Sequence, residues 1–154
     1  MDALELLLAE RACERLIYQY CRVVDDGNHS LLADLFTEDG IFDNRDMRLE
    51  GREQIRRVFT EREAVRELRT RHVCTNVLVD VRAPTEASGV VYLSLYRRRG
   101  PVDWTVPVPS TLPVLVGSYH DSYARVEGTW LIRSRVQQAP FVDPSDDGWS
   151  TATR

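Results

Sequence analysis

The sequence contains no lysine, so all 20 of its basic residues are arginines. Without a lysine amine the chain cannot form a Schiff base with a carbonyl substrate, and it cannot build a Walker-type phosphate loop. Cysteine is also scarce, since Cys13, Cys21 and Cys74 are the whole set and form no CxxC pair. We therefore expect reduced, packed thiols rather than a disulfide framework or a zinc site.

The chain also lacks any apolar run near the roughly 20 residues that span a bilayer. Its N-terminus has neither the basic nor the apolar region of a signal peptide. The sequence also has no excess of positive charge, since 24 acidic and 20 basic residues give a net charge of −4. The longest run of basic residues is only residues 97–99. These absences predict a cytoplasmic protein that contacts neither membrane nor nucleic acid.

What is present is the composition of an ordinary globular protein, with 43% hydrophobic and 29% charged residues. A chain of 154 residues has the usual size of one domain around one hydrophobic core. We therefore expect a single domain over residues 1–140. Residues 141–154 are expected to form a polar C-terminal tail.

Three segments of the first half have helical periodicity. Between residues 4 and 24, apolar side chains recur at intervals of three and four, which predicts an amphipathic helix of about six turns. Gly27 provides turn chemistry before a short second helix at residues 31–36. A third helix is expected after Gly51, with apolar positions that continue to Leu68.

From His72 onward the period changes to two, which predicts strands. The expected strands are a short hairpin at residues 41–49 and longer strands at residues 72–81, 90–96, 114–126 and 129–138. The proline-rich stretch 100–113 is expected to be a long loop of the kind that often borders a binding site. Helices followed by strands predict an α+β protein in which helices cover one face of an antiparallel sheet.

The strand that begins at His72 has two different faces. One face carries Val73, Thr75, Val77, Val79 and Val81, and the other carries His72, Cys74, Asn76, Leu78 and Asp80. If the helices cover the His72 face, a homodimer packed sheet to sheet is the simplest cover for the valine face. The alternative is that β-bulges change which face points inward.

Two residues are candidates for acid-base chemistry. Asp25 lies five residues after Tyr20 at the end of the first helix, where the helix dipole and partial burial should raise its pKa. His72 is the second candidate, because a histidine beside a carboxylate on an inward face is suited to proton transfer. The alternatives are an aspartate that only caps a turn and a structural histidine.

Four further residues are candidates for substrate contacts. Arg135 on the last strand would need an anion or a carbonyl partner if it faces inward, and a surface salt bridge is the alternative. Tyr96 and Tyr119 have strand spacing, which is typical of core residues, although phenols near a pocket can donate to a carbonyl. Asn76 shares its strand face with His72.

Five segments along nearly the whole chain carry a resemblance to a known family. They read YCRVVDDGN from Tyr20, LADLFTED from Leu32, EGREQI from Glu50, RHVCTN from Arg71 and GTWLIRSR from Gly128. Together they resemble the SnoaL-like branch of the nuclear transport factor 2-like superfamily. The resemblance implies a cone-shaped α+β barrel, in which a curved antiparallel sheet and three N-terminal helices enclose an apolar pocket, often in a dimer.

Within this superfamily the sequence is most similar to the dehydratases, namely bile acid 7-alpha-dehydratase and, more distantly, scytalone dehydratase. This similarity implies that Tyr20, Asp25, His72 and Arg135 are catalytic and that neither a metal nor another cofactor is needed. The strand at residues 90–96 lacks the second active-site histidine of scytalone dehydratase.

The first functional hypothesis is a lyase that removes water from a β-hydroxy carbonyl group in a hydrophobic polycyclic, steroid-like or polyketide-like substrate. His72, oriented by Asp25, would take the carbon-bound proton, and Tyr20 and Arg135 would donate to the carbonyl oxygen. A cyclase or isomerase with the same dyad is the second hypothesis, and a non-catalytic small-molecule-binding domain is the third. An epoxide hydrolase would need a second aspartate joined to Asp25 by an arginine.

Overall fold

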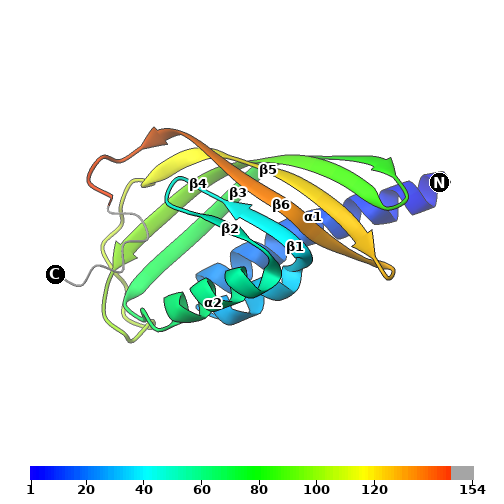
Figure 1. Ribbon diagram of the computed structural model, residues 1–154. Helices are drawn as coiled ribbons and strands as arrows, with labels where there is room; N and C mark the ends of the chain where they lie inside the picture. The colour runs from blue at the N-terminus through cyan, green and yellow to red at the C-terminus, as the bar shows by residue number, and fades with distance from the viewer. Residues whose placement is uncertain (147–154) are drawn as a thin grey trace.

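The computed structural model describes residues 1–146 as a six-stranded sheet with helices against one face (Figure 1). The helices are α1 (Ala3–Asp25), the 3₁₀ helix η1 (His29–Leu35) and α2 (Arg52–Glu63). The strands are β1 (Phe36–Asp43), β2 (Arg48–Glu50), β3 (Leu68–Ala83), β4 (Glu86–Arg99), β5 (Leu115–Val126) and β6 (Thr129–Val142). The predicted α+β class and the three N-terminal helices are confirmed.

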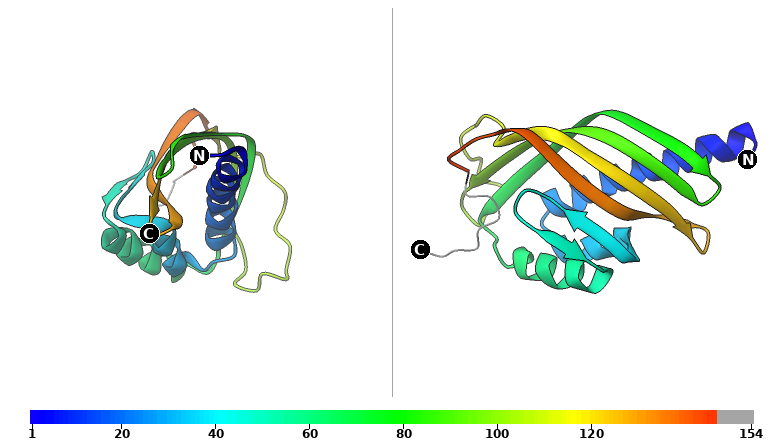
Figure 2. Two further views of the ribbon diagram at one scale, coloured as in Figure 1. Left: turned by 90° about the vertical axis from the view of Figure 1, so that its right-hand side faces the viewer. Right: turned by 45° about the horizontal axis from the view of Figure 1, so that its top comes forward.

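The sheet is mixed, curved and open. Its strand order is β2-β1-β6-β5-β4-β3, in which β1 runs parallel to β6 and every other neighbouring pair is antiparallel. The strands curve around the helices into a cone (Figure 2). The predicted cone with a curved sheet is therefore confirmed, with two differences: the sheet does not close into a barrel, and one of its strand pairs is parallel. Both differences arise because β1 enters beside the last strand in the same direction, and because β2 and β3 remain separate edges.

Helix α1 begins at a capping box formed by Asp2 and Glu5. The Glu5 N–H donates to the Asp2 carboxylate at 2.8 Å, and the Asp2 N–H donates to the Glu5 carboxylate at 2.9 Å. The buried side chains of α1 are Ala9, Cys13, Leu16, Ile17, Tyr20, Val24 and Asp25. Leu4, Leu7 and Leu8 belong to the predicted stripe but are 63%, 60% and 60% exposed. The first buried side chain is Ala9, so the inward stripe starts about one and a half turns later than the periodicity predicts.

Helix α2 closes the side of the cone opposite α1. Its Ile55 and Phe59 are fully buried, and the Phe59 ring meets the Phe42 ring of β1 edge-on with centroids 5.3 Å apart. The helix ends at Glu63 and not at Leu68, because Leu68 begins β3 with its side chain buried in the sheet. None of the helices within residues 1–146 is long and apolar enough to cross a membrane.

A β-bulge turns β3 over halfway along its length. The pairing of β3 with β4 shifts between Thr75 and Leu78, and Asn76 has a φ of 51°. The side chains on the inward face are His72 and Cys74 before the bulge and Val77, Val79 and Val81 after it. The predicted continuous valine face is therefore wrong and the bulge alternative is confirmed, since an extra residue exchanges the two faces of a strand.

The sheet continues past the predicted domain boundary. Residue 140 lies inside β6, which ends at Val142. Beyond it, the Asp143 N–H donates to the Val114 carbonyl at 2.9 Å, which ties the following segment to the start of β5. The rest of the predicted tail, residues 147–154, lies outside the described residues.

The bulge generates a stability prediction. Asn76→Val should lower the free energy of unfolding by about 1–2 kcal/mol, because a β-branched side chain is disfavoured at positive φ. Asn76→Gly should change it by less than about 0.5 kcal/mol, because glycine accepts this conformation readily. Urea unfolding followed by circular dichroism measures both values, and a valine variant as stable as the wild type would contradict a left-handed residue here.

Candidate active site

The side chains of Asp25 and His72 meet where the end of α1 lies against the start of β3. The His72 Nδ1 and the Asp25 Oδ1 are 2.6 Å apart, and the His72 backbone N–H donates to Oδ2 at 2.8 Å. The Thr70 hydroxyl donates to Oδ1 at 2.9 Å. The side chains of His72 and Asp25 are only 6% and 9% exposed. Because Asp25 engages Nδ1, Nε2 is the ring nitrogen left to exchange a proton with a bound molecule.

The environment of Asp25 favours its ionised form. Burial raises the pKa of this carboxyl, but the hydrogen bonds from His72 and Thr70 and the charge of His72 outweigh burial, so the net pKa lies below its ordinary value. The expectation of a raised pKa is wrong, because it included burial and the helix dipole but not the donors that β3 provides. An ionised Asp25 at neutral pH can orient His72 and stabilise the protonated ring.

Tyr20 forms an aromatic wall beside this pair. Its ring centroid lies 6.0 Å from that of His72 and 5.7 Å from that of Tyr119, and both contacts are edge-on. These three residues line one cavity, together with Phe42 and Leu95 among others. The cavity volume is about 10 Å³, which is about the space of one water molecule. Burial raises the pKa of the Tyr20 and Tyr119 phenols, so both remain protonated donors.

Arg135 lies behind this aromatic wall and does not line the cavity. It is completely buried, and its guanidinium donates to the Asp121 carboxylate at 2.9 and 2.6 Å. The same guanidinium lies 4.1 Å from the Tyr20 ring centroid and 4.5 Å from the Tyr119 ring centroid. The partner that a buried arginine requires is therefore Asp121 and not a substrate carbonyl. Asp25 pairs with His72 instead of Arg135, which disfavours the epoxide hydrolase alternative.

Two predicted substrate-binding residues lie outside the His72 cavity, whereas Tyr119 lines it. Asn76 is exposed, because it occupies the bulge. Tyr96 follows Leu95, which points inward, so strand alternation places Tyr96 on the outer face of β4. There it lines a separate cavity of about 350 Å³ bordered by the predicted 100–113 loop. The structure therefore does not bring Asn76 and Tyr96 together with the Asp25–His72 pair.

Sequence comparison identifies the family of this domain. Residues 5–136 match the SnoaL-like domain family. The chain belongs to this family. No match to a curated protein was found.

Solved structures with the same fold include proteins named after two kinds of enzyme. A protein from Novosphingobium aromaticivorans, provisionally described as a scytalone dehydratase, is 24% identical, with a TM-score of 0.76 over 92% of this chain and 91% of that chain. Hexachlorocyclohexane dehydrochlorinase LinA-type3 from Novosphingobium barchaimii is 14% identical, with a TM-score of 0.72 over 92% and 93%. A Mycobacterium tuberculosis protein of unknown function is 20% identical, with a TM-score of 0.71 over 92% and 78%. At these identities the likeness establishes a common fold.

The SnoaL-like site also contains residues that the sequence analysis missed. Thr70 lies two residues before His72 on the same strand face, so the alternation could have identified it. Asp121 lies opposite Arg135 in the pairing of β5 with β6, which the sequence does not reveal. Arg97 and Asp146 also line the cavity, from β4 and from beyond β6.

The described part of the SnoaL-like domain contains neither a disulfide bond nor a cluster of metal ligands. All three cysteines are free in the structure, and the Sγ atoms of Cys21 and Cys74 lie 3.5 Å apart between α1 and β3. Within residues 1–146, no group of three or more histidine, cysteine or acidic side chains is arranged to hold a metal ion.

The Arg135–Asp121 pair should stabilise this SnoaL-like domain from behind the cavity. Arg135→Met is expected to cost about 3–5 kcal/mol of unfolding free energy, because it leaves the Asp121 charge buried and unpaired. The double variant with Asp121→Leu should recover a substantial part of this loss, since neither charge remains. Guanidinium denaturation measures both effects. A single variant that loses less than about 1 kcal/mol would contradict the structural role given to Arg135.

Proposed function

We propose that this protein is a cofactor-independent lyase that eliminates water from a β-hydroxy carbonyl group in a hydrophobic polycyclic, steroid-like or polyketide-like substrate. The observation that carries the proposal is the 2.6 Å contact between the buried Asp25 carboxylate and His72 at the edge of an aromatic cavity. A histidine that a carboxylate orients through one nitrogen is suited to remove a proton with the other.

In the proposed reaction, His72 Nε2 takes the proton from the carbon next to the substrate carbonyl. The electron pair of that C–H bond moves to the carbonyl oxygen and forms an enolate. The ionised Asp25 stabilises the imidazolium that results, and Tyr20 donates a hydrogen bond to the negative oxygen. The enolate then expels hydroxide from the β-carbon, and hydroxide takes the proton from His72. The products are an unsaturated carbonyl compound, water and neutral His72.

Arg135 acts in this proposal as a positioning residue. Burial keeps the pKa of the Tyr20 phenol high, and the nearby charge of Arg135 lowers it in part. A phenol whose proton is polarised in this way is a better hydrogen-bond donor to an enolate oxygen. Arg135 therefore holds the Tyr20 and Tyr119 rings and tunes the donor, without contact to substrate.

The names of the fold neighbours agree with an elimination, since one is described as a dehydratase and another as a dehydrochlorinase. A cyclase or an isomerase would begin with the same proton transfer, so product analysis on a panel of hydroxy ketones is the deciding experiment. An unsaturated ketone formed with loss of water supports the lyase. A ring-closed or rearranged product of unchanged mass would replace it with the cyclase or isomerase, and binding without turnover would support a binding domain.

The dyad predicts a specific kinetic pattern. His72→Ala and Asp25→Asn should each lower turnover by about 10²–10⁴-fold, the usual contribution of a positioned acid-base group. Substrate affinity should change little, because the apolar walls hold the ligand. Tyr20→Phe should lose less, since the ring remains and only one neutral donor is removed. Single-turnover assays and ligand titration measure the two quantities separately.

A matched control separates this effect from unfolding. His120 lies on the outer face of β5, where its Nε2 is 3.1 Å from the Ser118 hydroxyl, so His120→Gln should retain full turnover. Full turnover by a folded His72→Ala protein would contradict proton removal by His72.

We also propose a homodimer that buries the outer face of the sheet. Val73 on β3, Tyr92 on β4 and Phe141 on β6 are 46%, 56% and 67% exposed on this face. Large apolar side chains grouped in this way commonly mark an interface. Light scattering should give twice the chain mass of 17.7 kDa for the wild type and one chain mass for the Tyr92→Glu, Phe141→Glu variant. A wild-type monomer in dilute solution would contradict the dimer.

A further inference from the structure

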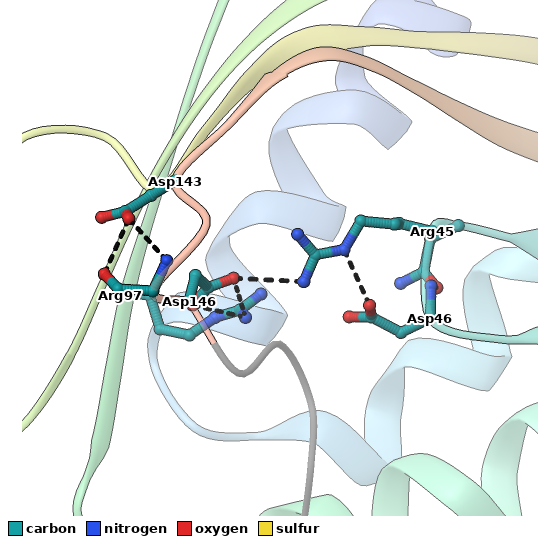
Figure 3. Close-up of polar contacts among 7 residues, drawn as sticks. Arg45, Asp46, Arg97, Asp143 and Asp146 are labelled. Carbon is teal, nitrogen blue, oxygen red and sulfur yellow. Dashed lines mark hydrogen bonds and ion pairs between the residues drawn. The ribbon is translucent and has the colours of Figure 1, made fainter.

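Four charged side chains close the cavity that holds His72. Arg45 and Asp46 come from the turn between β1 and β2, Arg97 comes from β4, and Asp146 follows β6 (Figure 3). All four line the cavity, and we call them the mouth cluster. The side chains of Arg45 and Asp46 are 32% and 25% exposed, whereas those of Arg97 and Asp146 are only 7% and 6% exposed. The mouth cluster therefore spans the distance from the cavity to the solvent.

Asp146 is the anion that two arginines share. Both of its carboxylate oxygens accept from Arg97 Nη1, at 3.1 and 3.0 Å, and Oδ2 also accepts from Arg45 Nη2 at 3.4 Å. Arg97 Nε has no hydrogen-bond partner among the described residues. A buried guanidinium requires an anion, so the protein needs a carboxylate at this position as long as the cavity stays closed.

The segment that carries Asp146 is attached by local contacts. Asp146 lies four residues beyond the end of β6, and its N–H donates to the Asp143 carbonyl at 3.1 Å. The Asp143 carboxylate accepts from the Ser145 N–H at 2.8 Å and from the Ser145 hydroxyl at 2.7 Å. A turn of this kind, outside the strand ladder, opens at a lower free-energy cost than the sheet does.

The cavity of about 10 Å³ has no room for a substrate, so its lining must move before one can reach His72, and the mouth cluster is the charged part of that lining that extends to the solvent. Departure of Asp146 would leave Arg97 and Arg45 without their shared anion. We propose that these two arginines bind a carboxylate group of the substrate, and that Asp146 occupies this site in the free protein. The proposal deepens the proposed function, on which it rests, by defining the substrate as a hydrophobic carbonyl compound that carries a carboxylate away from the reacting carbon.

The geometry favours a carboxylate over a neutral polar group. The site already holds a carboxylate whose two oxygens both contact one guanidinium, and such charge-assisted hydrogen bonds are about twice as strong as neutral ones. The aromatic walls formed by Tyr20, Phe42 and Tyr119 lie in the same cavity and suit fused rings. A substrate with its rings at these walls would place its carboxylate at the mouth and its reacting carbon near His72.

The test compares two probes of the same shape, 2-naphthoate and the neutral 2-naphthamide, by titration calorimetry at neutral pH. In the wild type both probes must displace Asp146, and naphthoate gains at the arginines only what the Asp146 carboxylate gives up, so the two dissociation constants should agree within about threefold. Asp146→Ala should tighten the binding of naphthoate by at least about tenfold more than the binding of naphthamide, because only naphthoate can replace the Asp146 carboxylate. Adding Arg97→Gln to this variant should abolish the preference for the carboxylate.

Two controls keep the result interpretable. Asp43→Asn removes the same charge from a surface pair with Arg48 and should leave both affinities unchanged. Asp146→Asn removes the negative charge but keeps the size of the side chain. It should also favour naphthoate, which distinguishes the loss of the charge from the extra room that alanine creates. Equal gains for both probes would mean that Asp146 only fills volume, and they would overturn the proposal. No naphthoate binding to Asp146→Ala at millimolar concentration would overturn it as well.

This experiment is independent of catalysis, because neither probe has a hydroxyl group to eliminate. A carboxylate preference together with full turnover by His72→Ala would overturn the proposed dyad and leave the anion site standing. If the wild type dehydrates a hydroxy ketone and the Asp146→Ala variant shows no preference for the carboxylate probe, the anion site would be overturned and the proposed lyase would stand.

Discussion

The Asp25 carboxylate joins α1 to the edge strand β3. It accepts hydrogen bonds from the backbone N–H and the ring of His72 and from the hydroxyl group of Thr70. These contacts fix where α1 crosses β3 and which face of β3 points inward at that height. They also keep the carboxylate ionised in spite of burial. The position of the His72 ring, and with it the chemistry of the cavity, depends on this connection.

Around that connection the interior is built from aromatic rings and arginines. Arg135 lies against the rings of Tyr20 and Tyr119 and pairs with Asp121 behind the cavity, while Arg97 pairs with Asp146 in the lining of the cavity. A planar guanidinium can stack on a ring and bind a carboxylate at the same time, which a lysine ammonium does less well. A chain without lysine is therefore well suited to a cavity in which charge must be buried beside aromatic walls.

Local patterns predicted the first helix as far as Val24 and the strand that carries His72, whereas the pairing of Asp25 with His72 became the favoured interpretation only through the resemblance to SnoaL-like proteins. They offered a bulge only as an alternative and could not locate it, because a single left-handed residue at Asn76 leaves the alternation of residues 73–81 intact in the sequence. Nor could they identify Asp121 as the partner of Arg135, since that contact depends on the register of β5 with β6. The direction of the Asp25 pKa shift was missed for the same reason, because its donors come from another element.

The central claim is that His72, oriented by Asp25, removes a proton from carbon beside a carbonyl group. Hydrogen–deuterium exchange of the ketone 2-tetralone in D₂O, followed by proton NMR, measures this step without requiring a leaving group. If His72 removes this proton, the carbons that flank the carbonyl should exchange faster with the wild type and at the uncatalysed rate with folded His72→Ala protein. Equal exchange with both proteins, or no acceleration by a wild type that binds the ketone, would contradict it.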